Sequence, residues 1–145
     1  MEIRLAENGD LSGWVQLVEP MRHLFPGLET PESMEALCAV ENGTICGVLA
    51  FSRAENELAF LAVSAQHRRQ GIARKLAERM FRELDPSRPV KLITYRAGVP
   101  EGEAARSLYQ RLGFCPGRLV EVDGSPAQEF LRPAEIPGSE RSEAE

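Results

Sequence analysis

The sequence predicts an α/β (α+β) fold in which a mixed, mostly antiparallel sheet of about seven strands is flanked by helices. The prediction rests first on a nearly continuous apolar run at residues 57–63, which is typical of a buried strand. The next segment repeats an apolar residue at every fourth position from Ile72 to Leu84, which is one face of a helix. A second apolar run follows at residues 90–95. Because a right-handed helical crossover joins the two strands, we expect them to be parallel.

The other strands are expected to be antiparallel. Asn42-Gly43 separates two apolar runs and is a strong short signal for a β-hairpin. Asp85-Pro86 ends the crossover helix, because proline cannot continue it. Residues 123–126 form the turn between the last two predicted strands. The antiparallel strands are expected at residues 2–6, 36–40, 45–51, 118–122 and 127–131, and an early helix is expected at residues 11–18.

Length and composition are those of a single soluble domain. The chain has 145 residues, of which 43% are hydrophobic and 27% are charged, enough for a substantial core. One domain is expected over residues 1–132. Residues 133–145 are rich in proline, serine and glutamate, so they are expected to form a disordered acidic tail.

Charge and cysteine content narrow the class of function. The net charge of −5 gives no electrostatic reason to bind nucleic acid, and no apolar run is long enough to span a membrane. The first residues lack the apolar segment of a secretory signal. The three cysteines are an odd number without metal-ligand spacing, so reduced thiols, a cytoplasmic location and no metal site are expected.

A basic loop lies between the strand at 57–63 and the crossover helix. Its basic residues are Arg68, Arg69, Arg74 and Lys75, four of the 17 in the chain. Gly71 and Ala73 leave room for a ligand to approach the backbone, and the first turn of a helix offers N–H groups without internal partners. The pattern predicts an anion site for two adjacent phosphates, with an arginine-rich solvated turn as the alternative. It lacks the lysine of a Walker loop and the three glycines of a dinucleotide fingerprint.

Two motifs in the chain resemble those of the GNAT superfamily, the acetyl-CoA-dependent N-acetyltransferases. Residues 68–73 match the family's pyrophosphate loop, Gln/Arg-x-x-Gly-x-Gly/Ala, at its three defined positions. A predicted helix that begins near Ala104 ends in the family's Tyr-x-x-x-Gly-Phe pattern at Phe114. The resemblance covers residues 36 to 115 well. It implies the GNAT fold, in which the central parallel strands splay apart at their C-terminal ends.

The resemblance implies acetyl-CoA as the cosubstrate and a site without metal. The amides from Arg69 to Ala73 are expected to bind the pyrophosphate, and Arg68 and Arg74 are expected to add charge. The pantetheine arm is expected between the splayed strands, where unpaired backbone groups can bind it. The implied cofactor-binding residues are Leu61, Ala62, Val63, Arg68, Arg69, Gln70, Gly71, Ile72, Ala73 and Arg74.

Two catalytic residues are implied by the same resemblance. Tyr109 is the expected general acid for the departing thiolate, with a buried, hydrogen-bonded core tyrosine as the alternative. Glu57 is the expected general base at the start of the central strand, with a solvated strand end as the alternative. Glu101 and Glu103 come next, although acids at a helix N-terminus already have a structural reason. Gly102 replaces an asparagine that contacts the cofactor arm in most family members.

Two functions agree with these residues. The first is an N-acetyltransferase that acts on a primary amine of a small molecule or peptide in a ternary complex. The second is an acetyl-CoA-binding sensor or interaction module without turnover. The acceptor and the oligomeric state, a homodimer included, stay open at this point. The short segment at residues 30–35 predicts a wide acceptor pocket, and His23 is expected to be a half-buried neighbour without a catalytic role.

Overall fold

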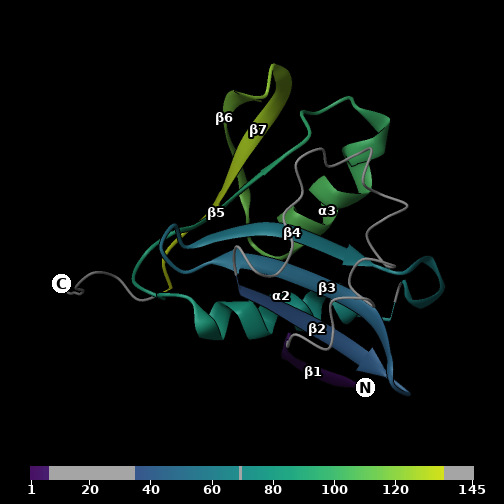
Figure 1. The fold of residues 1–145 in the computed structure, drawn as a ribbon. Coiled ribbons are helices and arrows are strands. Elements are labelled where there is room, and N and C mark those ends of the chain that lie inside the picture. Colours follow the sequence, from purple (N-terminus) through teal and green to yellow (C-terminus); the bar gives the residue numbers. More distant parts are fainter. Residues whose placement is uncertain (7–34, 69, 136–145) are drawn as a thin grey trace. The chain divides into compact units, whose positions relative to one another are not determined.

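The structure is a computed structural model that describes residues 1–6, 35–68 and 70–135. Its strands are β1 (Glu2–Leu5), β2 (Glu35–Glu41), β3 (Thr44–Ser52), β4 (Glu57–Val63), β5 (Val90–Thr94), β6 (Cys115–Val122) and β7 (Ser125–Arg132). Its α-helices are α2 (Ile72–Glu83) and α3 (Glu103–Arg111) (Figure 1). The strands form a mixed sheet in the order β1-β2-β3-β4-β5-β7-β6 with β4 and β5 parallel, which confirms the predicted fold class.

Two compact units divide the chain and are described in turn. The first contains Met1–Arg53 and Leu58–Glu83, and the second contains Ala54–Glu57 and Leu84–Glu145. In the first unit, β2 is antiparallel to both β1 and β3. The predicted hairpin is confirmed, because Asn42 and Gly43 have φ values of 52° and 78°. Positive φ at both central residues is what a type I′ hairpin turn requires.

Helix α2 packs along one face of β1, β2 and β3 (Figure 1). Its buried residues are Ile72, Leu76, Ala77 and Met80, which include the first three residues of the predicted apolar stripe. The fourth, Leu84, is buried but lies one residue beyond the end of the helix. Gly47 in β3 allows this close approach, because a Cβ at Gly47 would lie only 2.9 Å from Cγ2 of Ile72. Since Ile72 is the first residue of α2, this contact fixes the place where the helix begins.

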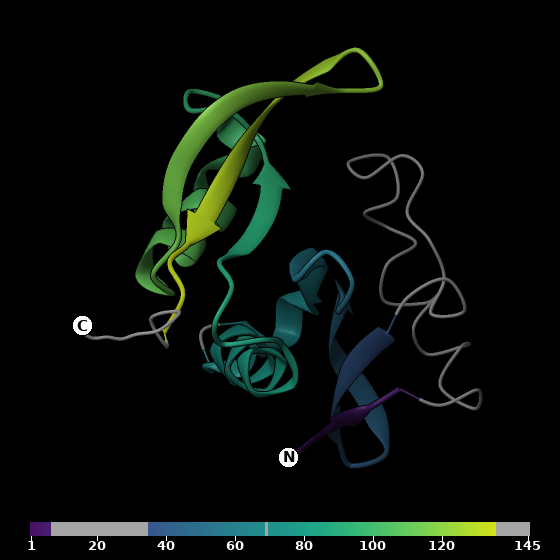
Figure 2. The same ribbon diagram turned by 90° about the vertical axis from the view of Figure 1, so that its left-hand side faces the viewer.

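In the second unit, β7 is antiparallel to both β5 and β6, and β6 and β7 form a long twisted hairpin (Figure 2). Both strands extend beyond the predicted ranges 118–122 and 127–131. The turn contains only Asp123 and Gly124, whose φ values are 51° and 81°, so the two residues that follow already belong to β7. The first residues of β6 are exposed and therefore carry no apolar pattern that marks a strand.

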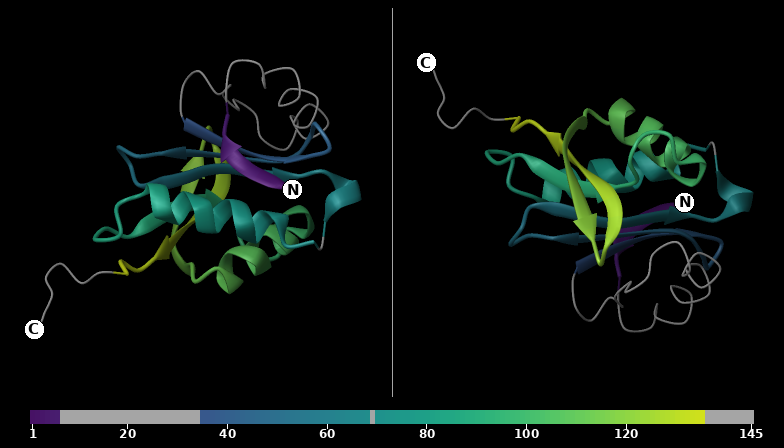
Figure 3. Two further views of the ribbon diagram at one scale, coloured as in Figure 1. Left: turned by 90° about the horizontal axis from the view of Figure 1, so that it is seen from below. Right: turned by 90° about the horizontal axis from the view of Figure 1, so that it is seen from above.

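Helix α3 packs beside the β6–β7 hairpin (Figure 3). The ring of Tyr109 in α3 contacts that of Phe130 in β7. The parallel pairing of β4 with β5 places Glu57 opposite Lys91. Glu57 belongs to the second unit, although the rest of β4 belongs to the first. The predicted divergence of the two strands beyond this pair stays a prediction, as does a single domain ending at residue 132.

Some predictions concern residues outside those that the structure describes. They are the helix at 11–18, His23, the segment at 30–34, Arg69, and the tail from residue 136 onward. Cys38 and Cys46 are buried and Cys115 is exposed, and none of the three forms a disulfide. Neither α2 nor α3, the α-helices in the described ranges, is long and apolar enough to cross a membrane.

Candidate functional site

The loop between β4 and α2 is fixed by one contact within itself and by two hydrogen bonds to strands. Oγ of Ser64 lies 2.6 Å from Nδ1 of His67, and the N–H of Ser64 donates to the carbonyl of Cys46 in β3. Arg68 turns back, and its Nε donates to the carbonyl of Val63 at 3.2 Å. The guanidinium of Arg68 therefore lies beside the last residue of β4.

The first turn of α2 combines unpaired backbone donors with positive charge. The first helical bond runs from the N–H of Lys75 to the carbonyl of Gly71 at 3.0 Å. The N–H groups of Ile72, Ala73 and Arg74 therefore have no helical acceptor. The turn contains no acidic residue, although acids favour this end of a helix and cations oppose it. A bound anion would account for this choice of residues.

Gly71 leaves the approach to this turn open. Its φ is +77°, and no atom of the described residues lies within 4 Å of the position that a Cβ would occupy. Glycine is needed here for the backbone conformation, and the open space is available to a ligand. Beside it, Gln70 is exposed, and Nε of Arg74 lies 3.6 Å from a carboxylate oxygen of Glu78 in an exposed ion pair.

The predicted backbone site in β4 is partly occupied by the chain itself. Ala62 is buried, whereas Leu61 and Val63 are half-buried. The carbonyl of Val63 already accepts the bond from Arg68. A carbonyl oxygen can accept two hydrogen bonds, so a ligand that uses this carbonyl either shares it with Arg68 or displaces Arg68.

Tyr109 lies near the C-terminal end of α3 and is held by the residues that end this helix. Gly113 has φ of +98°, and its N–H donates to Gln110 while the N–H of Phe114 donates to the carbonyl of Tyr109. These two bonds are the Schellman motif. The apolar contact that accompanies the motif is made by the rings of Tyr109 and Phe114, whose centroids are 6.1 Å apart. The Tyr-x-x-x-Gly-Phe pattern thus positions the tyrosine through both backbone and ring.

The side chain of Tyr109 is buried between aromatic rings. The residue is 9% exposed, and its ring packs edge-on against Phe130 with 6.4 Å between centroids. Within the described part of the chain, no hydrogen-bond partner contacts the hydroxyl. Burial raises the pKa of Tyr109 to about 12, so the phenol is protonated at neutral pH. A buried donor without a partner costs stability, so the alternative of a satisfied core hydroxyl has no support among these residues.

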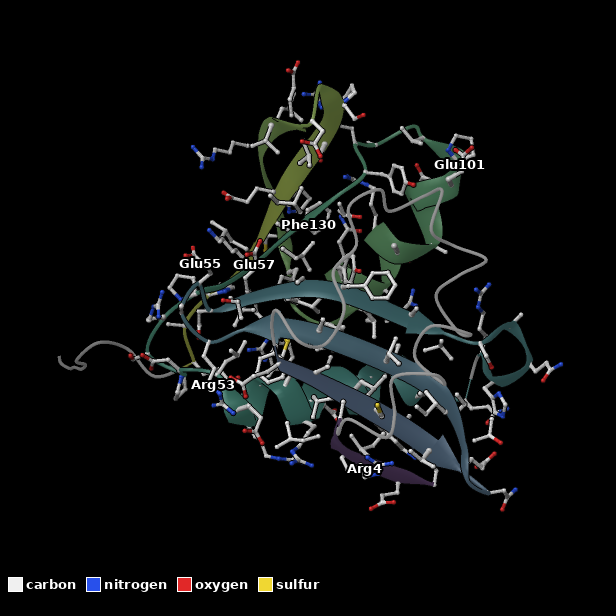
Figure 4. All side chains as sticks on the ribbon, in the orientation of Figure 1. Arg4, Arg53, Glu55, Glu57, Glu101 and Phe130 are labelled. Carbon is white, nitrogen blue, oxygen red and sulfur yellow. The ribbon has the colours of Figure 1, made fainter. Side chains whose placement is uncertain are left out.

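Glu57 is half-buried at the start of β4. Burial raises the pKa of its carboxyl, the positive charge of Lys91 opposes this, and the charges of Glu55 and Glu129 reinforce it. Glu55 and Glu57 lie at the same end of the unit, whereas Glu101 lies at the other end, beside α3 (Figure 4). Glu101 is therefore far from Glu57. The carboxylate of Glu103 is engaged elsewhere, since it accepts the N–H of Gly98 at 3.0 Å.

Asn56, which the sequence reasoning passed over, anchors Glu57. It is 1% exposed, and its φ is 52°. Its Oδ1 accepts the N–H of Asp85 at 3.0 Å, and its Nδ2 donates to the carbonyls of Asp85, Arg88 and Pro89. These bonds tie the start of β4 to the segment that leads into β5. The available signal was an asparagine in a turn, the residue type that tolerates positive φ and bonds to backbone.

Position 102 has no room for a side chain, which explains the glycine found there. A Cβ there would lie 2.3 Å from Cβ of Tyr95 and 2.5 Å from its Cγ. Tyr95 therefore occupies the space that a side chain at Gly102 would need, and the asparagine of the family pattern has no room in this chain.

The predicted residues fall into two groups. Glu57 and Tyr109 belong to the second unit, and the residues of the basic loop and of Leu61–Val63 belong to the first. Arg106, a further residue that the sequence reasoning gave no role, contacts Phe130 beside Tyr109. Across the described ranges, no group of three or more His, Cys, Asp or Glu side chains is arranged to hold a metal ion.

Comparison with known proteins gives one family and many similar folds. A profile of the Acetyltransferase (GNAT) domain matches residues 32–116. The chain is similar to the ribosomal-protein-S18-alanine N-acetyltransferase from Escherichia coli, with a TM-score of 0.73, 23% identity, and 97% of this chain and 98% of that one covered. It is also similar to the ribosomal-protein-alanine N-acetyltransferase from Brucella melitensis, with a TM-score of 0.69, 13% identity, and coverage of 91% and 99%.

A third similar structure is Chaetomium thermophilum Naa20 in complex with a bisubstrate analogue. The TM-score is 0.67 at 16% identity, and 93% of this chain and 87% of that one are covered. At these identities the solved structures show a shared fold. No curated protein matches the sequence.

Proposed function

The chain belongs to the GNAT acetyltransferase family, and from that premise we propose that it transfers the acetyl group of acetyl-CoA to the α-amino group of a peptide. The observation that carries this proposal is the hydroxyl of Tyr109. It is buried, protonated and unpartnered among the described residues, and the motif that ends α3 holds it in place. A donor kept in this state suits a group that meets its partner only when substrate is bound.

The start of α2 fits the pyrophosphate of acetyl-CoA. Three N–H groups without helical acceptors, an open approach at Gly71 and two cations in place of acids all favour a doubly charged anion. Arg68 adds positive charge beside the end of β4, and the carbonyl of Val63 has a second lone pair with which it can accept a donor of the amide-rich pantetheine arm. This support comes from the chain's own donors and charges.

Acetyl-CoA supplies an acetyl thioester, whose cleavage leaves negative charge on sulfur. Tyr109 donates its hydroxyl hydrogen to that charge. A thiol has a pKa of ~8.5 and the phenol of Tyr109 one of about 12, so complete proton transfer between them is uphill by about 5 kcal/mol. We therefore expect Tyr109 to stabilise the charge as a hydrogen-bond donor first. The proton that the amine loses balances the one that the thiol gains.

Glu57 is the proposed acceptor for the proton of the amine, directly or through water. Its burial moves its pKa upward, towards the range in which a carboxylate is an effective base. Asn56 fixes the backbone beside it through buried hydrogen bonds. Glu103 is less suited, because its carboxylate already accepts a backbone N–H.

Compared with a lysine side chain, an α-amino group needs less help from a base, because more of it is already neutral at physiological pH. With a pKa of ~8 it is neutral about one-fifth of the time at pH 7.4, whereas a lysine with a pKa of ~10.4 is neutral about once in a thousand. The difference is roughly 3 kcal/mol. Two of the similar structures are alanine N-acetyltransferases of ribosomal proteins, and alanine has no side-chain amine. Both considerations favour a peptide N-terminus.

The test is thiol release from acetyl-CoA with three acceptors. They are a peptide that begins with alanine, the same peptide with a blocked N-terminus and one internal lysine, and a small diamine. We expect fastest release with the free alanine peptide and acetylation at its first residue by mass spectrometry. Absence of release with every amine, together with tight binding of acetyl-CoA, would contradict the enzyme and support an acetyl-CoA-binding module.

A further inference from the structure

Arg106 lies one helical turn before Tyr109 on α3, on the same side of the helix. Its Nη1 donates to the carbonyl of Tyr95 at 2.8 Å and to Oε1 of Gln128 at 2.7 Å. Its guanidinium carbon lies 4.9 Å from the centre of the Phe130 ring. One side chain therefore joins α3 to the end of β5 and to β7.

The partners of Arg106 are themselves fixed. Nε2 of Gln128 donates to the carbonyl of Gly117 at 2.8 Å, so both ends of the Gln128 amide are engaged. Phe130 is fully buried, and its ring packs edge-on against that of Tyr109 at 6.4 Å. The contacts form a continuous series from β6 through Gln128, Arg106 and Phe130 to the ring of Tyr109.

We propose that Arg106 is a positioning residue for Tyr109: its guanidinium, from α3, packs on the ring of Phe130 in β7 and fixes that ring (the Arg106 clamp), and Phe130 holds the ring of Tyr109 in its reacting orientation. This inference rests on the proposed role of Tyr109. The Schellman motif fixes the backbone of Tyr109 and one ring contact to Phe114, and the Arg106 clamp supplies the second ring contact, to Phe130.

The planar shape of the guanidinium is the property that this role needs. Arg106 stacks on a ring and donates in its own plane to two oxygens at once, which a lysine ammonium cannot do. Among the described residues, its hydrogen-bond acceptors are neutral oxygens, and no carboxylate forms an ion pair with it. The contacts of Arg106 thus depend on its planar geometry. Arg106→Lys keeps the positive charge without that geometry, so its activity is expected to be nearly as low as that of Arg106→Met.

The first test compares turnover in matched variants. Arg106→Met removes the clamp, whereas Arg111→Met removes an arginine of the same helix that donates to Oγ of Ser107 at the exposed surface. We expect Arg106→Met to lower kcat roughly 10- to 100-fold with KM for acetyl-CoA within about twofold, the scale of a misplaced catalytic group. Arg111→Met should leave both unchanged.

A double-mutant cycle shows whether Arg106 acts through Tyr109. In a Tyr109→Phe background, we expect Arg106→Met to cause less than about a threefold further loss, because residues that act as one unit are not additive. A full additional loss in that background would overturn the proposal. So would a parent-like kcat in Arg106→Met alone.

A spectroscopic readout makes the test independent of turnover and of the acceptor. The chain has only two tyrosines, so Tyr95→Phe protein labelled with 3-fluorotyrosine has one ¹⁹F signal, from Tyr109. We expect Arg106→Met to shift or broaden that signal and Arg111→Met to leave it. If Arg106→Met does not fold, Gln128→Leu, which removes one acceptor and keeps the arginine, is expected to shift it instead. An unchanged signal in the folded variant overturns the clamp, even if the parent proves to have no turnover.

Discussion

Burial acts on Tyr109 and Glu57 in the same direction, with different chemical consequences. Removing water disfavours the charged form of both groups, so both pKa values rise. For Tyr109 this preserves the protonated donor. For Glu57 it brings a carboxylate closer to the pKa at which it accepts protons well near neutral pH. One physical effect thus suits both the proposed donor and the proposed acceptor, which lie in the same unit.

If Glu57 is the general base, the activity should depend on pH. A base acts in its deprotonated form, so kcat/KM should fall as pH decreases through the raised pKa of Glu57. In Glu57→Gln, kcat/KM at neutral pH should fall by about 10²–10⁴, the range for a general base, and this acidic limb should disappear. An unchanged profile in Glu57→Gln would assign the base role to another group or to water.

Glu57→Gln is predicted to lower activity but to raise the stability of the fold. Because the folded state raises the pKa of Glu57, folding becomes less favourable as pH rises from the unfolded value near ~4.3 through the raised value. Glu57→Gln removes that penalty. The variant should therefore unfold with a higher free energy than the parent at neutral pH, and the difference should vanish below about pH 4. Urea titrations at both pH values measure it.

Asn56 is predicted to be among the least replaceable polar residues of the second unit. Asn56→Ala leaves the N–H of Asp85 and the carbonyls of residues 85, 88 and 89 without their side-chain partner, and it forces alanine to a φ of 52°. We expect a loss of about 2–4 kcal/mol in the free energy of unfolding. Asn56→Asp keeps the acceptor and loses the donors, so its stability should fall between those of the parent and Asn56→Ala. A loss below about 1 kcal/mol in Asn56→Ala would contradict this role.

Among the elements, α2 begins with residues that do not favour helix stability but that suit the proposed anion site. Gly71 provides no side-chain cap, and the first turn carries cations where acids would be more stable. The contact between Gly47 and Ile72 fixes the start of the helix from the core side instead. Stability of this helix thus comes from packing, which leaves its first N–H groups available.

Substitution at Gly71 tests this use of the helix start. Gly71→Glu introduces negative charge and strain, and calorimetry should show acetyl-CoA binding weakened by at least roughly 2 kcal/mol. Gly43→Glu is a matched control, because Gly43 has the same φ within 1° and equally open surroundings in a distant turn. It should lose similar stability and keep parent affinity. Equal affinity for Gly71→Glu and Gly43→Glu would remove the anion site.

Helix α3 is predicted to tolerate no side chain at Gly102. A methyl group at this position would lie 2.3 Å from Cβ of Tyr95, so Gly102→Asn requires backbone movement. We expect a loss of roughly 1–3 kcal/mol, the scale of overpacking. Tyr95→Ala should not rescue it, because alanine retains the Cβ that collides. Parent-like stability of Gly102→Asn in thermal unfolding would show that the segment adapts.

For the whole molecule, the sequence predicts elements whose residues alternate between core and solvent. The helical stripe that begins at Ile72 is of this kind, and it is confirmed as far as Met80. The Asn42-Gly43 turn is recognised by its residue types instead, and it is confirmed too. The β6–β7 hairpin is underestimated, because β6 is exposed along nearly its whole length and Pro126 lies within β7. Exposed strands have no apolar period by which they can be recognised.

The residues of the candidate site also differ in whether the sequence alone could reveal them. Motifs such as Tyr-x-x-x-Gly-Phe are local, so the sequence contains them entirely, and here they build a Schellman motif around Tyr109. The roles of Asn56 and Arg106 depend on partners about 30 and about 22 residues away, which no local pattern reveals. Gly102 could be recognised as a departure from the family, but its cause, the ring of Tyr95, is a tertiary contact.

The most direct test of the central claim is the comparison of Tyr109→Phe with the parent protein. The substitution removes one hydroxyl and keeps the ring contacts with Phe114 and Phe130. If the hydroxyl donates to the departing sulfur, kcat for thiol release falls by about 10²–10⁴, while the Kd of acetyl-CoA by calorimetry changes less than about threefold. A kcat within about threefold of the parent would contradict this role and reduce Tyr109 to a packing residue.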